Sequence, residues 1–172
     1  MFLKGFKEKS IKKCINETLA NRKVSINNNV IKSLGVIINI EEIDDLEPFR
    51  NLAETLNIRP NKFKIIAYTT VKKDALYAWD VCFNPNDFGW HGKIKNIELE
   101  TFLDSNFDAL ISYYTSDVLE LKLMTVISKA QFKIGNLQED ERINDLIIKT
   151  NLNDFITFKK ELIKYLNRLN KI

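Results

Sequence analysis

The chain has 172 residues with 26 basic and 23 acidic side chains, so its formal net charge is only +3. Hydrophobic residues make up 45% and charged residues 28%, which excludes a disordered chain and is typical of one globular domain. No run approaches the roughly 18 apolar residues of a membrane span, and the lysine-rich start does not have the apolar segment of a signal peptide. Cys14 and Cys82 form no CxxC pair and are expected to be free thiols. We therefore expect a cytoplasmic protein.

Apolar residues near the start of the chain recur at three- and four-residue steps, which predicts an amphipathic helix. They are Leu3, Phe6, Ile11, Cys14, Ile15 and Leu19. Lysines occupy the opposite face. Up to Lys23 there are seven basic residues against Glu8 and Glu17, whereas the rest of the chain sums to −2. We interpret residues 1–32 as a basic helix with a linker and residues 33–172 as an α/β domain.

The basic face of this helix has two interpretations. It is either an arm for nucleic acid, an anionic membrane surface or an acidic protein, or the solvated face of a helix packed on the sheet. The glutamates dilute the lysines and no arginine or aromatic cluster accompanies them, which favours the second interpretation. Under the first interpretation, the contacts come from Lys4, Lys7, Lys9, Lys12 and Lys13.

The next segments predict a strand, a helix and a strand. Residues 34–40 (LGVIINI) form a continuous apolar run that suits a strand buried on both faces. Asp44, Asp45 and Pro48 predict a helix start, because carboxylates favour the positive end of a helix and proline its first turn. Residues 63–68 (FKIIAY) predict the second strand.

The second half of the chain repeats this pattern. Alternating residues from Tyr77 to Phe83 predict a half-exposed third strand, followed by a loop over 84–96 and a short helix or turn over 97–106. A strand over 108–114, a helix over 117–130 and a strand over 131–135 complete a second unit. A strand over 144–150 and a helix capped by Asn153 or Asp154 end the chain. We expect a single three-layer, Rossmann-like α/β domain with a mostly parallel sheet and right-handed crossovers.

In a parallel sheet, ligands bind beyond the carboxyl ends of the strands. Three loops qualify, over residues 39–45, 69–74 and 115–117, and none is glycine-rich. Neither the dinucleotide nor the P-loop fingerprint occurs, so we expect no nucleotide cofactor. At the third loop we expect the helix start to be filled by its own carboxylates, with Asp117 as the N-cap and Glu120 as its reciprocal partner.

Catalytic and metal-binding candidates are few. Any nucleophilic triad has to use His91, the sole histidine, yet a lone histidine in a glycine-bearing loop is more often a packing or surface residue. One histidine and two distant cysteines cannot supply a zinc site, and no metal is expected. The remaining candidates for carboxylate chemistry, or for magnesium or calcium, are Glu41, Glu42, Asp44 and Asp45. This cluster is more simply a solvated helix start.

The loop over residues 84–96 (NPNDFGWHGKIKN) is the one elaborated loop of the chain. Its predicted partner-binding residues are Asp87, Phe88, Trp90 and His91. If the partner contains RNA, exposed aromatic residues would stack on bases, the candidates being Tyr77, Trp79, Phe88 and Trp90. Aromatic residues in strands and ordered loops are more often part of the core.

Three stretches carry a resemblance to known families: LGVIINI, NDFGWHGK, and FDALISYY followed by LELKLMTVISKAQFKIG. Together they resemble a family of small uncharacterised proteins from Bacteroidota, which implies a cytoplasmic location. The last stretch is also similar to the N-terminal, acceptor-side half of heptosyltransferase-type GT-B glycosyltransferases. That similarity implies the fold and no catalytic residue, and we expect the second domain, which holds the nucleotide-sugar, to be missing.

We therefore expect a non-catalytic binding or adaptor module. It would contact a protein or a ribonucleoprotein, for example the ribosome, through the N-terminal helix and the loop over residues 84–95. The alternative is a small enzyme that uses the crevice at the strand carboxyl ends. An enzyme needs a deep pocket where polar side chains converge, whereas an adaptor needs only an exposed apolar or basic patch.

Overall fold

The computed structural model describes residues 2–23, 29–43, 45–70, 82–136 and 139–172. Its centre is a six-stranded sheet in the order β3-β2-β1-β4-β5-β6, in which every strand pair is parallel. The strands are β1 (Leu34–Asn39), β2 (Phe63–Tyr68), β3 (Cys82–Phe83), β4 (Ala109–Tyr113), β5 (Phe132–Gly135) and β6 (Leu146–Ile147). This order confirms the predicted α/β fold with a parallel sheet.

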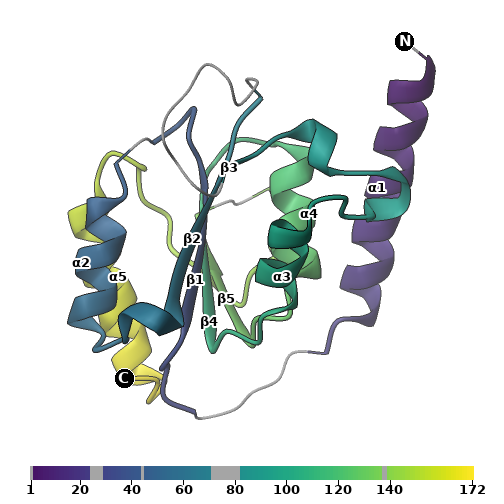
Figure 1. Ribbon diagram of the computed structural model, residues 1–172. Helices are drawn as coiled ribbons and strands as arrows, with labels where there is room; N and C mark the ends of the chain where they lie inside the picture. Colours follow the sequence, from purple (N-terminus) through teal and green to yellow (C-terminus); the bar gives the residue numbers. More distant parts are fainter. Residues whose placement is uncertain (1, 24–28, 44, 71–81, 137–138) are drawn as a thin grey trace.

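Helices cover both faces of the sheet (Figure 1). On one face lie α2 (Glu47–Thr55) and α5 (Phe155–Arg168), and on the other lie α3 (Ile97–Asp104) and α4 (Leu119–Ile127). Within the described residues, three short 3₁₀ turns connect the elements, namely η1 (Pro60–Lys62), η3 (Pro85–Asp87) and η4 (Trp90–Gly92). The six residues of β1 and the five of β4 are all buried, as expected for central strands covered on both faces.

The N-terminal helix α1 (Phe2–Asn21) lies outside this three-layer arrangement (Figure 1). It packs against α4 and η4, and not on the sheet as the sequence suggested, because α3 and α4 already cover that face. Ile11, Ile15 and Leu19 are buried in the core on this side. Phe6, which the sequence assigned to the apolar face, has 58% of its surface exposed.

Helix α4 differs from its prediction at its first turn. It begins at Leu119, and its N-cap residue is Val118, which provides no side-chain cap. Asp117 forms an ion pair with Lys122, so the predicted capping role of Asp117 is wrong. The opposite ammonium group attracts this carboxylate away from the backbone N–H groups of the first turn. Helix α5, by contrast, has the predicted cap, because Asp154 Oδ1 accepts a hydrogen bond from the backbone N–H of Thr157 at 3.1 Å.

The two edge strands of the sheet are short. β3 and β6 have two residues each, and β6 is shorter than the sequence predicted. Tyr77, Trp79 and Val81 of the predicted third strand lie outside the described residues. Cys14 and Cys82 form no disulfide, as expected. Within the described part of the chain, no helix combines the length and the apolar composition that crossing a bilayer requires.

Candidate functional site

The order of the strands reverses between β1 and β4. The chain moves from β1 to β2 in one direction and from β4 to β5 in the other, so that the loops after β1 and β4 diverge at the carboxyl edge of the sheet. In open α/β sheets this reversal creates the crevice in which ligands bind. A nucleotide or another anionic ligand of this fold would therefore bind in this crevice.

A glutamate of the chain fills this crevice. Glu42, from the loop after β1, accepts hydrogen bonds from the backbone N–H groups of Thr115 and Ser116 at 3.1 and 3.0 Å. It also accepts from both hydroxyl groups, at 2.7 Å from Thr115 Oγ1 and 2.9 Å from Ser116 Oγ. Four donors of the loop after β4 therefore surround one carboxylate, in the manner in which such loops surround the oxygen atoms of an anionic ligand.

Neighbouring residues hold this arrangement in place. Asn39, the last residue of β1, donates from Nδ2 to Ser116 Oγ at 3.0 Å and accepts from the backbone N–H of Glu41 at 3.1 Å. Glu41 reaches the loop after β2, where its Oε1 accepts from the backbone N–H of Thr70 at 2.7 Å. These hydrogen bonds, first among them the one from the Thr70 hydroxyl, lower the pKa of Glu41. Two carboxylates from the loop after β1 thus bind the loops after β2 and β4, the strands on either side of β1.

The sequence predicted that the loop after β4 would be filled by the protein's own carboxylates, and named Asp117 and Glu120. The structure assigns this role to Glu42, which sequence reasoning had placed at a solvated helix start. The available signal was the pair Glu41-Glu42 directly after a buried strand, at a position where nucleotide-binding folds have glycines. No anion can reach these donors unless the Glu42 side chain moves away.

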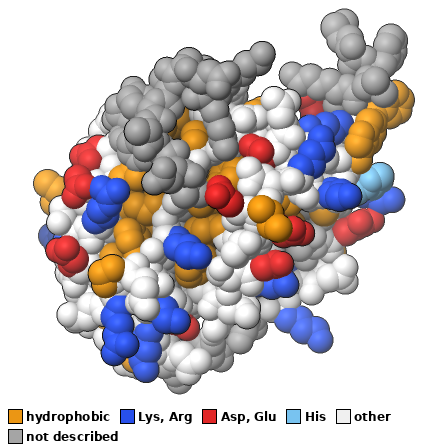
Figure 2. All heavy atoms as spheres, in the orientation of Figure 1, with side chains coloured by type: hydrophobic (Ala, Val, Ile, Leu, Met, Phe, Trp, Pro, Cys, Tyr) orange, Lys and Arg blue, Asp and Glu red, His pale blue; other side chains and the backbone are white. Residues whose placement is uncertain are grey.

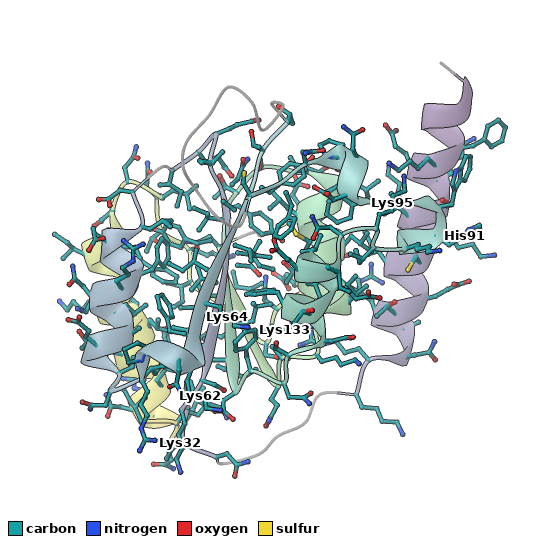
Figure 3. The ribbon with its side chains drawn as sticks, in the orientation of Figure 1. Lys32, Lys62, Lys64, His91, Lys95 and Lys133 are labelled. Atoms are coloured by element: carbon teal, nitrogen blue, oxygen red, sulfur yellow. The ribbon has the colours of Figure 1, made fainter. Side chains whose placement is uncertain are left out.

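His91 and Asp45, the two catalytic candidates that the structure describes, do not converge. The backbone of His91 is left-handed (φ 54°) and its N–H donates to Ser10 Oγ at 3.1 Å, while its ring is exposed (Figure 3). Within the described residues, the ring has no hydrogen bond to a carboxylate of the kind that orients a catalytic histidine. Asp45 accepts a hydrogen bond from the backbone N–H of Glu47 at 3.0 Å, next to the start of α2. Asp44 lies outside the described residues.

The two segments predicted to bind a partner lie against each other. Lys7 of α1 donates to the carbonyl oxygen of Pro85 at 3.1 Å, and the Ser10 hydroxyl accepts from the N–H of His91. Gly92 has a φ of +73°, and a Cβ added to it would lie 2.8 Å from Cys14 Sγ, so only glycine permits this close approach. Helix α1 and the loop over residues 84–95 therefore form one continuous surface.

Two of the predicted contact residues shape this loop from the inside. Asp87 Oδ2 accepts from the backbone N–H of Asn84 at 2.9 Å, and its Oδ1 accepts from Asn96 Nδ2 at 3.3 Å. Phe88 is fully buried, with its ring centroid 6.5 Å from that of Tyr68. The sequence named Phe88 as a partner-contact residue, although aromatic residues of ordered loops usually belong to the core. The structure places Phe88 in the core, so its predicted contact role is wrong.

Other side chains of these segments face outward. Trp90 has 45% of its surface exposed, and His91, Lys93 and Lys95 are exposed beside it. On α1, Phe6, Lys9 and Lys13 lie along the strip next to Ser10, because residues three and four apart share one helix face. Lys9 Nζ lies 5.9 Å from the centroid of the Phe6 ring. Figure 2 shows hydrophobic and basic side chains around His91, together with an acidic one, over this part of the molecule. We use the name aromatic–basic surface for the exposed side chains of Phe6, Lys9, Lys13, Trp90, His91, Lys93 and Lys95.

Comparison with known proteins gives the family. A model for a family of unknown function, DUF6913, matches residues 7–169. The chain belongs to this family. No curated protein and no solved structure matches the chain.

The match to DUF6913 includes most of α1 and the entire loop over residues 84–95, as well as the sheet. In this DUF6913 domain, α1 separates the predicted lysines into two groups. Lys9 and Lys13 belong to the aromatic–basic surface, and Lys7 contacts the loop. Lys12 points to the other side, where it lines a cavity. The side chain of Lys4 lies outside the described residues.

Proposed function

We propose that this DUF6913 domain is a non-catalytic binding module that contacts a protein or a ribonucleoprotein, for example the ribosome, through the aromatic–basic surface. The single observation that carries this proposal is the docking of α1 on the loop over residues 84–95, which places Phe6 and Trp90 in one exposed region. Exposed aromatic residues are enriched among those from which binding surfaces obtain most of their affinity, and lysines beside them would attract an acidic partner.

The contacts at the carboxyl edge of the sheet support a non-catalytic role. Glu42 satisfies the donors that would otherwise hold an anionic substrate or cofactor, and the exposed His91 has no acidic partner among the described residues. Nucleotide chemistry at the strand reversal would first have to break the hydrogen bonds of Glu42. A binding module that works through its outer surface has no such requirement.

We further propose that the protein is cytoplasmic and of Bacteroidota origin, and that its fold is related to the acceptor half of heptosyltransferase-type glycosyltransferases. The parallel sheet with strand order 3-2-1-4-5-6 favours this relationship, because such enzymes use the same doubly wound architecture. It is also the observation that favours a second candidate function, a small enzyme acting in the crevice at the strand carboxyl ends. That candidate predicts that Asp45→Asn lowers the activity on an acceptor substrate, whereas the binding module predicts unchanged partner capture.

Affinity purification from a lysate of the organism tests the proposal. The bait is the full chain, compared with the variants K9E/K13E and W90A. We expect both variants to lose the captured partner, because they reverse the charge and remove the largest exposed aromatic side chain of the surface. RNase treatment and a salt titration of the captured complex distinguish RNA-mediated from protein-mediated contact, since contacts to phosphates weaken steeply with salt.

The matched control is K149E/K160E. Both of these lysines are exposed and lie outside α1 and the loop, and the variant changes the net charge by the same amount as K9E/K13E. Unchanged capture by K9E/K13E and W90A, or equal loss by K149E/K160E, contradicts the proposed surface. Circular dichroism melting curves of the four proteins confirm that each variant is folded.

A further inference from the structure

Lys133 is a buried lysine without an ion pair among the described residues. It lies in β5, and only 4% of its surface is exposed (Figure 3). Its Nζ donates one hydrogen bond, at 2.8 Å, to the carbonyl oxygen of Val126 in the last turn of α4. An ammonium group has three N–H donors, and the described part of the chain provides no second acceptor for this one. Lysine is almost never buried to this extent unless its charge is paired.

The carboxylate beside Lys133 binds other donors. Asp145 Oδ2 accepts from the backbone N–H of Lys133 at 2.8 Å, and Asp145 Oδ1 lies 2.7 Å from Arg22 Nη2. Each oxygen of Asp145 thus has a donor other than the Lys133 ammonium group. Burial, and then the charge of Arg22, lower the pKa of Lys133 to about 8 and outweigh the charge of Asp145, which raises it. At pH 7 most molecules therefore still hold a buried positive charge at Lys133.

A ligand can reach Lys133 through a cavity that this residue lines. The cavity has a volume of about 640 Å³, within the range of small-molecule sites, roughly 300–1,000 Å³. It lies between the end of α1, the last turn of α4 and the segment over residues 128–131 that leads into β5. This is the amino edge of the sheet, opposite the crevice that Glu42 fills. We use the name Lys133 cavity for it.

The charges that line the Lys133 cavity are mainly positive. Lys129 binds Asp104 at 2.8 Å, and the one acidic lining residue, Glu17, lies 3.7 Å from Lys13 on the exposed face of α1. An anion that enters the cavity therefore meets a positive balance, in which Lys133 is the most buried charge. Among the described residues, the charged lining residues are Glu17, Arg22, Lys23, Lys129 and Lys133.

The burial of a single ammonium group determines what kind of anion fits. A dianion such as phosphate would leave a surplus of negative charge in the protein, and a buried unpaired charge is costly whatever its sign. A carboxylate has one charge and two acceptor oxygens, which suits an ammonium group that still has free N–H donors. Apolar walls of the same cavity come from Val126, Ile127 and Ala130, and they suit a hydrocarbon chain.

From this combination we infer that the Lys133 cavity binds a short aliphatic monocarboxylate, with the carboxylate on the Lys133 ammonium group and the hydrocarbon chain against the apolar wall. None of the described lining residues belongs to the aromatic–basic surface. The site therefore adds a small-molecule ligand to the proposed function without depending on it.

Isothermal titration calorimetry of the full chain with sodium butyrate at pH 7 tests this inference. We expect butyrate to bind and butyramide, which has the same carbon chain without charge, to show no binding. Lys133→Met should lower the affinity for butyrate by about tenfold or more, because it removes the buried charge that the carboxylate contacts. Thr18→Trp, which fills the cavity from α1 and keeps the ammonium group, should abolish binding.

The affinity for butyrate should also depend on pH. With a pKa of about 8, the protonated fraction of Lys133 falls about tenfold between pH 7 and pH 9, while butyrate stays ionised. The wild-type affinity should therefore fall by about the same factor. Any residual binding by Lys133→Met should lack this decrease, which assigns the decrease to Lys133 and not to another charged residue of the cavity.

The matched control is Lys160→Met, which removes the charge of an exposed lysine on α5. It should keep the wild-type affinity, and so should W90A, which separates this test from that of the partner surface. The inference is overturned if the wild-type protein does not bind butyrate, if butyramide binds as well, or if Lys133→Met and Lys160→Met have equal effects. If Lys133→Met does not fold, the result for Thr18→Trp decides, because unchanged butyrate binding by that variant overturns the inference alone.

Discussion

Glu42 binds Ser116 through both of its carboxylate oxygens: Oε1 accepts from the backbone N–H at 3.0 Å and Oε2 from the hydroxyl at 2.9 Å. These two residues are separated by 74 positions in the sequence, so the contact fixes the loop after β1 to the loop after β4. In a nucleotide-binding protein of this architecture, a phosphate group would make the equivalent contacts.

Replacing Glu42 with alanine should destabilise the fold. The substitution removes the acceptor of four donors in the loop after β4, two on the exposed Thr115 and two on the half-buried Ser116. A hydrogen bond to a charged group typically contributes about 1.5–3 kcal/mol. We expect a loss of about that size in the free energy of unfolding, measured by urea denaturation. Glu42→Gln keeps one side-chain oxygen and should lose less. Glu54→Ala on the exposed side of α2 is the control, with a change of about 0.5 kcal/mol or less. An equal effect of Glu42→Ala and Glu54→Ala would mean that the contact has no stabilising role.

Gly92→Ala should weaken the docking of α1 on the loop. Alanine is strained at a φ of +73°, and its Cβ would lie 2.8 Å from Cys14 Sγ. We expect a loss of about 1–3 kcal/mol in unfolding free energy. The double variant C14A/G92A removes the clash with sulfur but keeps the backbone strain. Gly92→Ala should therefore lower the unfolding free energy less in the Cys14→Ala background than in the wild type. Strictly additive effects of the two substitutions would exclude the steric contact.

Lys133 should make the stability of the protein depend on alkaline pH. Its side chain is buried and donates to the carbonyl oxygen of Val126 at 2.8 Å (Figure 3). Burial, followed by the charge of Arg22, lowers the pKa of Lys133 from 10.5 to about 8. The unfolded chain therefore binds this proton more tightly than the folded chain does, and the unfavourable contribution of Lys133 decreases as the pH rises from about 8 to about 10.5.

This pH dependence is measured as the difference in unfolding free energy between wild type and Lys133→Met across that pH range. The difference cancels the titration of other groups, including Tyr113, whose pKa burial raises to about 12. We expect the wild type to gain stability relative to the variant by up to about 3 kcal/mol. Lys129→Met, which changes a lysine with 58% of its side chain exposed, should give no such slope. A constant difference between wild type and Lys133→Met would refute the lowered pKa.

Arg22 should be important for holding the end of α1 to the body of the domain. Its Nη2 lies 2.7 Å from Asp145 Oδ1, and the two side chains are only 16% and 7% exposed. Its Nη1 also donates to the carbonyl oxygen of Arg142 at 2.8 Å. Removing one partner of a buried ion pair typically costs about 3–5 kcal/mol, so Arg22→Ala should strongly destabilise the protein in thermal or urea denaturation.

The pair Lys13–Glu17 is the control for Arg22. It spans 3.7 Å on the exposed face of α1, with 73% and 63% of the two side chains exposed. Exposed pairs of this kind contribute about 0–1 kcal/mol, so Lys13→Ala should have little effect on unfolding. Similar losses for Lys13→Ala and Arg22→Ala would show that burial does not distinguish the two pairs.

Local patterns in the sequence predicted the fold well. The apolar runs of β1 and β2, and the cap at Asp154, depend on residues that are close in sequence, and each appears in the structure as expected. The length of the edge strand β6 was overestimated, because an apolar run does not reveal how much of it finds a pairing strand. Most of the predicted third strand lies outside the described residues.

The candidate site was less predictable, since it depends on contacts between distant residues. The bonds of Glu42 to Thr115, and of Ser10 to His91, connect segments separated by 73 and 81 positions. A single sequence carries no direct signal of such proximity. The sequence did identify α1 and the loop over residues 84–95 as separate candidates, and the structure adds that they adjoin. It also places Phe88 inside the loop, leaving Trp90 as its main exposed aromatic residue.

Helix α1 has two sides with different surroundings: Phe6, Lys9 and Lys13 face solvent, while Glu8 and Lys12 face the cavity between α1 and the start of α4. A rigid helix cannot shift on one side alone, so any ligand that moves α1 from inside also moves the outer residues. By the same rigidity, a partner that moves α1 from outside also moves the residues of α1 that line the cavity. The helix would thus act as a two-sided coupler, in which any effect of one side on binding at the other is reciprocal.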